Sequence, residues 1–372
     1  MTPGRVVIAA NSAWHIANFR RELIRALARH GYEPIVVAPA DPTGRVKDLE
    51  VEHVDLPFER SGLNPFADLA LLLRYRQVLK RLRPAAFLGF TIKPNIYGGI
   101  AAASLGIPSI ANISGLGTAF IRRGPLQVLV TALYRFALRR ASFVFFQNPD
   151  DRALFLERRL VRANQARLIP GSGVDLARFA MKPLPDGPPT FLFIGRLLGD
   201  KGVRELIQAV RKLREAHPNM RTQLLGPLDG HNRTAISRSE LNDWVSHGLV
   251  EYLGETGDVR PFIEKATAVV LPSYREGLPR SLLEAAATGR PLIATDVPGC
   301  REAVDQGVNG FLCAPRNAES LADAMRRLLD LTPDGRSAMG LASRRKVESK
   351  FSETVVIQAY LDALGNVAPL RG

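Results

Sequence analysis

Two glutamates with seven residues between them are the first candidates for chemistry in this sequence. They lie in "SYREGLPRSLLEAAATGRP" (273–291), with Glu276 in a turn after a buried apolar run and Glu284 inside the helix that follows. Pro279 fits the first helical position, where its missing N–H costs nothing. Carboxylates there can accept hydrogen bonds from hydroxyl groups, as in a sugar or ribose. For the pair alone, a capping glutamate and a solvated helix glutamate are the simpler interpretation, so the surrounding residues must decide.

The backbone at the start of this helix offers hydrogen-bond donors as well. The N–H groups near Gly277, Leu278 and Arg280 precede or open the helix, at the positive end of its dipole. Such an arrangement suits a polar, anionic ligand. We therefore expect the stretch from Glu276 to Glu284 to be a binding site.

A second cluster lies in "FIGRLLGDKGV" (193–203), where Arg196 and Lys201 follow a strand-like run. A planar guanidinium and a compact ammonium together suit phosphate oxygens. Ordinary surface charges at a helix start are the alternative interpretation. No D-x-D motif and no His/Cys cluster at ligand spacing occurs, so we expect no metal and no other cofactor.

Apolar strands and amphipathic helices alternate from end to end, which predicts an α/β fold of parallel sheets covered by helices. The helices expected in the first half span 17–30, 66–82, 95–105 and 124–140. Those expected in the second half span 201–216, 235–245, 258–266, 279–288, 318–330 and 334–349. The strands expected between them are "RVVIAA", "YEPIVVAP", "VEHVDLP", "AAFLGF", "IPSIANI", "SFVFFQ" and "ARLIP", then "TFLFIG", "RTQLLG", "LVEYLG", "AVVLPS", "PLIATD" and "GFLCAP".

The length of 372 residues allows two domains, because one hydrophobic core rarely grows beyond about 250–300 residues. "MKPLPDGPP" (181–189) is rich in proline and predicts an interdomain linker. We expect two doubly wound, Rossmann-like domains, 1–180 and 190–350, facing a central cleft. Ligands of such sheets bind at the carboxyl ends of the strands.

Charge is spread unevenly along the chain. Residues 1–180 hold 25 Lys and Arg against 13 Asp and Glu, net +12, whereas residues 181–372 hold 25 against 23, net +2. This asymmetry predicts that the first half meets an anionic partner such as lipid headgroups, phosphates or nucleic acid. The two cysteines give no disulfide framework, which favours a reduced, intracellular protein. No signal peptide is recognised, and no apolar run reaches the roughly 20 residues that span a bilayer.

The string "LPSYREGLPRSLLEAAATGRPLIATDVPGCREAV" resembles the signature of family 4 glycosyltransferases, retaining enzymes with the GT-B fold. The likeness covers nearly the whole chain and extends to 193–203, "GSGVDLARF" (171–179) and "VNGFLCAP" (308–315). "SGLNPF" (61–66), "GLGTAF" (115–120) and "PGCREAV" (298–304) are similar to the bacterial group of N-acetylgalactosaminyltransferases that extend undecaprenyl-diphosphate-linked sugars.

The resemblance implies roles for particular residues. Glu276 would bond the donor hexose and stabilise developing positive charge, and Glu284 would bind ribose hydroxyls. Arg196 and Lys201 would hold the diphosphate of a nucleotide sugar, expected to be UDP-linked, as it leaves. The donor site would span Arg196, Lys201, Glu276, Gly277, Leu278, Pro279, Arg280 and Glu284. The fold also implies that the tail 351–372 packs back on the first domain, which would bind a lipid-linked acceptor.

For the acceptor, the sequence offers three candidates at predicted strand ends. His15 lies in "NSAWHIANFRREL" (11–23), Lys93 in "TIKPN", and Ser114 in "NISGLGTAF". The first loop lacks the paired glycines that many family members have, and Ser114 or Gly115 stands where many have a histidine. We therefore assign no catalytic base.

Basic, partly apolar helices could attach the first domain to a membrane. The segments "LLLRYRQVLKRLRP" (71–84) and "PLQVLVTALYRFALRR" (125–140) are too short to span a bilayer but can lie at its interface. Positive charges gather in 60–84, 122–123 and 135–140. We expect a cytoplasmic protein held peripherally on the anionic inner face of the cell membrane. The alternative interpretation is that both segments are buried core helices. For the helix faces that point toward the sheet, this interpretation must hold.

Three other functions come into question for a chain with this pattern. A dinucleotide oxidoreductase needs G-x-G-x-x-G after the first strand, where "NSAWHI" stands instead. A nucleotide-sugar epimerase can share the two-domain fold, but the paired glutamates and the Arg196 segment argue against it. A non-enzymatic binder of anionic ligands, including nucleic acid, would explain the charge, yet no nucleic-acid-binding motif is present and stacking aromatic residues are few.

Overall fold

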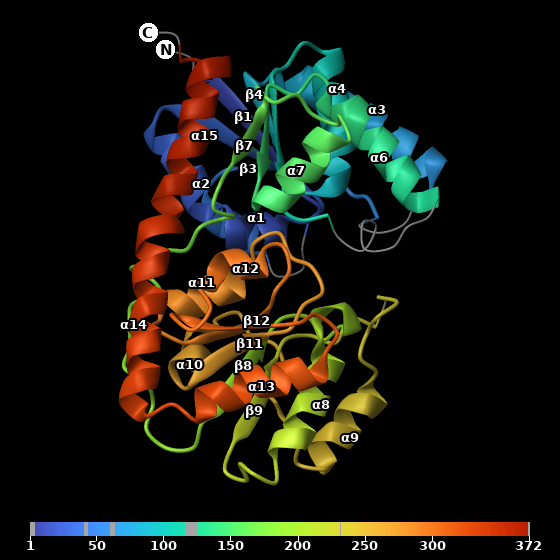
Figure 1. Ribbon diagram of the computed structural model, residues 1–372. Coiled ribbons are helices and arrows are strands. Elements are labelled where there is room, and N and C mark those ends of the chain that lie inside the picture. The colour runs from blue at the N-terminus through green and yellow to red at the C-terminus, as the bar shows by residue number, and fades with distance from the viewer. Residues whose placement is uncertain (1–3, 41–43, 60–63, 117–124, 231, 371–372) are drawn as a thin grey trace. The chain divides into compact units, whose positions relative to one another are not determined.

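The computed structural model describes the chain except for residues 1–3, 41–43, 60–63, 117–124, 231 and 371–372. The chain forms two compact α/β units (Figure 1). Unit 1 comprises residues 1–172 and 353–372, and unit 2 comprises residues 173–352. The predicted fold class, two Rossmann-like domains with parallel sheets, is confirmed.

Unit 1 contains a seven-stranded parallel sheet in the order β3-β2-β1-β4-β5-β6-β7. Its strands are β1 (Gly4–Ala9), β2 (Tyr32–Ala38), β3 (Glu52–Asp55), β4 (Ala86–Gly89), β5 (Ser109–Ile113), β6 (Phe143–Phe146) and β7 (Ala166–Leu168). Its helices and helical turns are α1 (Ala13–Phe19), α2 (Arg21–Arg29), η1 (Arg45–Leu49), α3 (Pro65–Leu82), the π-helical turn η2 (Pro94–Gly98), α4 (Gly99–Ser104), α6 (Pro125–Leu138), α7 (Pro149–Glu157) and α15 (Glu353–Val367).

Alternating strand residues face two separate hydrophobic clusters, so the sheet of unit 1 is covered on both sides. One cluster joins Val7, Phe87 and Val144 to the inner faces of α3, η2, α4 and α6. The other joins Val6 and Leu88 to α1, α2 and α15. The C-terminal helix α15 therefore forms part of the core of unit 1, where Tyr360 is fully buried.

Unit 2 contains a six-stranded parallel sheet in the order β10-β9-β8-β11-β12-β13 around one hydrophobic cluster. Its strands are β8 (Thr190–Ile194), β9 (Arg221–Leu225), β10 (Glu251–Tyr252), β11 (Ala268–Leu271), β12 (Leu292–Thr295) and β13 (Gly310–Cys313). Its helices and helical turns are η3 (Gly199–Lys201), α8 (Val203–Leu213), α9 (Arg238–Ser246), α10 (Arg260–Glu264), α11 (Arg280–Ala287), α12 (Cys300–Ala303), α13 (Ala318–Leu329) and α14 (Pro333–Lys350).

The Pro-rich segment 181–189 lies within unit 2, held there by a buried arginine. Arg290 is fully buried, and its Nη2 donates to the carbonyl oxygens of Lys182 and Pro183 at 2.6 Å each. The backbone N–H of Lys182 donates to Thr288 O at 3.1 Å. Burying a guanidinium is costly unless its N–H groups are bonded. Carbonyl oxygens accept from both Nη1 and Nη2 of Arg290, whereas its Nε has no hydrogen-bond partner among the described residues.

Candidate active site

Glu276 and Lys201 form an ion pair at the carboxyl edge of the sheet in unit 2. Glu276 follows β11, and Lys201 ends η3, which follows the neighbouring strand β8. Lys201 Nζ donates to Glu276 Oε1, and the two side chains are only 25% and 13% exposed. The two residues come from segments 75 positions apart in the sequence, and the structure brings them into direct contact.

Two glycines allow this contact. Gly202 has a φ of +72°, and a Cβ there would lie 2.1 Å from Pro272 O, so only glycine lets the start of α8 approach the end of β11. Gly299 has a φ of +86°, and a Cβ there would lie 2.4 Å from Gly277 O. The backbone N–H of Glu276 also donates to Pro298 O at 3.2 Å. The loop that carries Glu276 is thus fixed from both sides.

Arg196 lies on the same edge, after β8, and pairs with Asp229. Its Nη1 is 2.8 Å from Asp229 Oδ2. Asp229 follows β9, the neighbour of β8 on the other side from β11. The Arg196 side chain is 56% exposed, so an incoming anion can reach it.

Glu284 lies in the second turn of α11 and pairs with Arg280 at its start. Arg280 Nε donates to Glu284 Oε1 at 2.7 Å, and both side chains are largely buried. Burial raises the pKa of Glu284 above its ordinary value, while the Arg280 guanidinium opposes the shift. Burial disfavours the charged form of Glu284, so further hydrogen-bond donors would stabilise that form. Ribose hydroxyl groups would supply such donors.

The residues between the two glutamates form the start of α11. The helix begins at Arg280, and Pro279 is its N-cap, with a φ of −73° and a ψ of +117°, rather than its first helical residue as expected. The extended ψ explains the difference of one position. Leu278 packs into the core of unit 2, and Gly277 is buried as well. A contact of Leu278 with ligand would therefore involve its backbone.

The three candidate acceptor residues follow neighbouring strands of unit 1. His15, Lys93 and Ser114 lie after β1, β4 and β5, which are adjacent in the sheet. His15 is in the first turn of α1, where its backbone N–H donates to Ser12 Oγ at 3.2 Å. Its imidazole ring contacts the ring of Phe19, with the ring centroids 4.9 Å apart. Ser114 Oγ is 3.4 Å from Phe90 O.

Lys93 is held by a buried carboxylate that the sequence reading missed. Lys93 Nζ is 2.8 Å from Asp68 Oδ1, with side-chain exposures of 12% and 7%. Burial, together with a hydrogen bond to Asp68, raises the pKa of Tyr97. These three residues join the first turn of α3 to the end of β4, so an acceptor phosphate at Lys93 would have to compete with Asp68.

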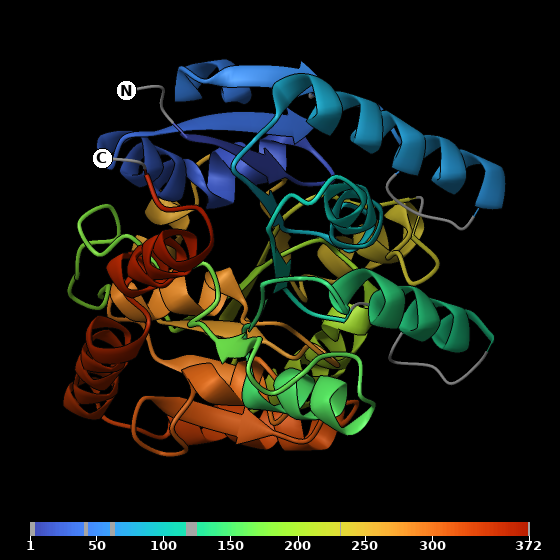
Figure 2. The same cartoon turned by 90° about the horizontal axis from the view of Figure 1, so that it is seen from above.

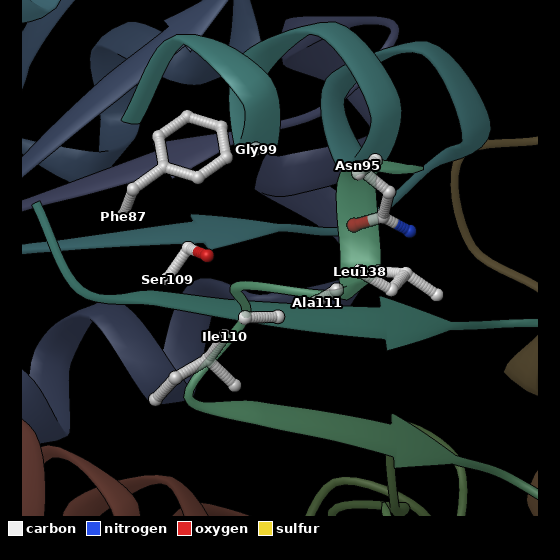
Figure 3. Close-up of a pocket in the computed structure, with 9 residues that line it drawn as sticks. Phe87, Asn95, Gly99, Ser109, Ile110, Ala111 and Leu138 are labelled. Carbon is white, nitrogen blue, oxygen red and sulfur yellow. The ribbon is translucent and has the colours of Figure 1, made fainter. Parts of the chain in front are cut away.

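A small cavity lies inside unit 1, between η2, α4 and the central strands (Figure 3). Asn95 Nδ2 donates to Asn112 O at 2.8 Å, while Asn95 Oδ1 points toward the cavity and has no hydrogen-bond partner among the described residues. The cavity has no space for a water molecule. It is a packing defect beneath the π-helical turn and not a ligand site.

Within the described part of the chain, no group of three or more His, Cys, Asp or Glu side chains could hold a metal ion. In the same residues, no helix is both long and apolar enough to cross a membrane.

The fold agrees with comparisons to known proteins. The model of the family "Glycosyl transferase 4-like domain" matches residues 16–171, and that of "Glycosyl transferases group 1" matches residues 188–331. Together the two matches cover most of both units. The chain is therefore a glycosyltransferase of the GT-B fold and the family 4 type.

The names of individual relatives describe sugar transfer to an undecaprenol-linked acceptor and capsular polysaccharide biosynthesis. The chain is 29% identical to N,N'-diacetylbacillosaminyl-diphospho-undecaprenol alpha-1,3-N-acetylgalactosaminyltransferase of Campylobacter jejuni, over 96% of this chain and 97% of that protein. It is 24% identical to the capsular polysaccharide biosynthesis glycosyltransferase CapM of Staphylococcus aureus, over 83% of each. Among solved structures, HepE of Anabaena in complex with UDP and glucose has a TM-score of 0.80 at 19% identity, covering 98% of this chain and 100% of that one.

Sequence reasoning found the cations and glutamates but missed two of their partners, Asp229 and Asp68. Asp229 stands in "LLGPLDG", directly after a predicted strand, and the rule that ligands bind at strand ends could have marked it. No comparable signal marks Asp68. It lies in a helix that also carries several basic residues, so from the sequence it looks like part of a solvent-exposed helix face.

Proposed function

We propose that the enzyme transfers a hexose or N-acetylhexosamine, with retention, from a UDP-sugar to a polyprenyl-diphosphate-linked saccharide in bacterial glycan or exopolysaccharide assembly. The observation that carries this proposal is the set of charged residues at neighbouring strand ends of unit 2, where Lys201 pairs with Glu276 and Arg196 follows β8. The Campylobacter relative is named for a lipid-linked acceptor, and HepE is described with UDP, which supports both halves of the proposal.

The cations account for departure of the nucleotide. When the bond between the anomeric carbon and the diphosphate oxygen breaks, negative charge grows on the diphosphate. Arg196 and Lys201 would bind its oxygens and stabilise that charge in place of a metal ion. Arg196 follows β8 and Lys201 ends η3, and each pairs with a carboxylate, Asp229 and Glu276 respectively.

The glutamates account for binding of the sugar and the ribose. Glu276 would exchange its bond with Lys201 for bonds from hexose hydroxyl groups, and would stabilise positive charge on the anomeric carbon. Glu284 would accept from ribose hydroxyl groups. In a retaining reaction the acceptor hydroxyl attacks the face that the diphosphate leaves, and a departing phosphate oxygen can accept its proton. His15, Lys93 and Ser114 are the proposed acceptor side.

We propose further that unit 1 attaches peripherally to the anionic inner face of the cell membrane. On α3 the side chains of Phe66, Leu69 and Leu73 are exposed, Phe66 to 86%, at the spacing of one helical face. Farther along the same face Arg76 and Lys80 are exposed. The face toward the sheet carries the core residues that the alternative interpretation expected, such as Leu71 and Tyr75.

The helix α6 repeats this order. Val128, Leu129 and Phe136 are exposed, and Arg139 and Arg140 follow them. Both helices pack against η2, and their N-terminal ends point to the same side of unit 1 (Figure 2). We call the six exposed apolar side chains of α3 and α6 the apolar stripe. On both helices the exposed apolar side chains lie nearer the N-terminal end than the basic ones. This order suits insertion of the apolar side chains into the bilayer while the basic side chains contact anionic headgroups. The predicted charges of 60–63 and 122–123 lie outside the described residues.

The donor half of the proposal is tested by a transfer assay with radiolabelled nucleotide sugars and polyprenyl-diphosphate-linked acceptors. The variant Arg196→Gln should lose most turnover and bind UDP more weakly. The matched control is Arg211→Gln, which removes a similarly exposed arginine of unit 2, on α8. Equal turnover by both variants would remove the phosphate role of Arg196, and absence of transfer with every nucleotide sugar would remove the proposal.

A further inference from the structure

A groove on unit 1 lies beside the apolar stripe and belongs to no site described so far. It has a volume of about 260 Å³ and is lined by Gln127, Val128, Thr131, Ala132 and Arg135 of α6 and by Arg158, the C-cap of α7. Pockets for drug-sized ligands begin near 300 Å³, so the groove suits a smaller group. It lies within unit 1, whereas all proposed donor contacts are in unit 2.

The groove combines donors with an apolar rim. Arg135 Nη2 donates to Arg158 O at 3.0 Å, which lays its guanidinium across the space between α6 and the end of α7. Arg158 contributes a second guanidinium to the lining. Thr131 Oγ1 is buried and has no hydrogen-bond partner in the described part of the chain. Two guanidinium groups and a spare hydroxyl form a donor set for a phosphate group.

The rim links this donor set to the proposed membrane surface. Val128 lines the groove and is also 71% exposed as a member of the apolar stripe. A ligand that fills the groove with an anionic group would therefore continue into an apolar chain along the stripe. That combination of a phosphate next to a hydrocarbon chain is the chemistry of a phospholipid, and two arginines disfavour headgroups with an added positive charge.

We propose that this groove binds the phosphodiester group of an anionic membrane phospholipid. The inference rests on the membrane attachment proposed above and deepens it: the apolar stripe supplies insertion, and the groove supplies a specific headgroup contact. It would fix the rotation of unit 1 on the bilayer, which a diffuse basic surface does not.

The test uses the full chain and short-chain lipids below their micelle concentration. Titration calorimetry with dihexanoyl phosphatidylglycerol should give saturable binding to the wild type, and much weaker binding of dihexanoyl phosphatidylcholine and inorganic phosphate. Arg135→Gln with Arg158→Gln should weaken phosphatidylglycerol binding at least tenfold. The control pair Arg25→Gln with Arg29→Gln removes the same charge from exposed positions of α2 in the same unit and should change it less than twofold. Thr131→Val, which keeps every charge, should weaken it severalfold.

Equal losses in the two arginine pairs would overturn the proposal, because they would indicate diffuse electrostatics. Phosphate binding as tight as that of phosphatidylglycerol would mean a free-anion site and would overturn the lipid assignment. Absence of saturable binding to the wild type would also overturn it. Flotation of the wild type with vesicles of phosphatidylglycerol tests membrane attachment separately. The apolar stripe can bind vesicles without the groove, so flotation without saturable lipid binding would overturn the groove proposal alone.

Discussion

The strand ends of unit 2 and the exposed faces of α3 and α6 in unit 1 use charge in opposite ways. In unit 2 the cations proposed to meet the ligand are already paired, Arg196 with Asp229 and Lys201 with Glu276. On unit 1, exposed arginines and lysines stand beside exposed apolar side chains. Paired charges in a fixed loop suit one ligand that exchanges for the internal partners. Exposed basic side chains next to exposed apolar ones, as on unit 1, suit an extended surface such as a bilayer.

The largest expected effect in this comparison is on the unit 2 side. Glu276→Gln keeps the size of the side chain but removes the charge that would stabilise the anomeric carbon. We expect kcat to fall by roughly 10²–10³, the range for removing one electrostatic contact to a transition state. Unfolding temperature should fall as well, because Lys201 loses its carboxylate partner in a largely buried pair, so turnover is measured well below the unfolding range. Turnover close to that of the wild type in the radiolabelled assay would contradict the role of Glu276.

The next effect tests the unit 1 side. Replacement of Phe66, Leu69 and Leu73 by serine should weaken binding to anionic vesicles roughly 100-fold, if each inserted side chain contributes about 1 kcal/mol. Co-sedimentation with vesicles measures this. The control replaces three apolar side chains of unit 2 that are also exposed, Val245, Val308 and Leu341. Equal losses in both triple variants would show that the apolar stripe has no special role.

A pH dependence follows from the environment of Glu284. Because burial raises its pKa, this carboxyl group takes up its proton at a higher pH than an ordinary glutamate. As pH falls through the raised pKa, the charged acceptor for the ribose is lost, and UDP affinity should fall by up to about tenfold. Glu284→Gln should bind UDP weakly at every pH in this range. A wild-type affinity that stays constant as pH falls to the ordinary pKa of a glutamate, about 4.3, would contradict the assignment.

The smallest effect distinguishes two roles for Asp229. If Asp229 competes with the diphosphate for Arg196, Asp229→Asn should tighten UDP binding about two- to fivefold, in line with the modest strength of exposed ion pairs. If it instead holds Arg196 in place, the same variant should weaken binding. Calorimetric titration with UDP decides between these outcomes. Asp243→Asn, which loses a pair with Arg211 on α8, should leave the affinity unchanged.

Much of the fold could be predicted because apolar runs and amphipathic stretches report directly on strands and helices. Every expected strand is present, with ends shifted by a few residues. The single helix expected over 17–30 is instead α1 and α2, which meet at Arg20, a buried residue whose guanidinium lies over the ring of Phe90. That contact joins residues far apart in sequence, so periodicity could not reveal the break.

The site could be predicted in part for the same reason. Glu276, Arg196 and Lys201 belong to recognisable strings, and strand ends gather them at one edge. Their pairing could not be predicted, because it depends on close approaches such as that of Gly202 to Pro272. The exposure of one face of α3 was also ambiguous, since leucines on both faces fit a buried helix equally well. Only packing against η2 decides which face meets the core.

The central claim is that the strand ends of unit 2 bind a nucleoside diphosphate through Lys201 and Arg196. Thermal unfolding of the wild type and of Lys201→Ala, with UDP and with UMP, tests it most directly. UDP at a hundred times its Kd should raise the free energy of unfolding of the wild type by about 2.7 kcal/mol. UMP at the same concentration should raise it less, and Lys201→Ala should lose most of the UDP effect. No shift with UDP, or an equal shift in the variant, would contradict the claim.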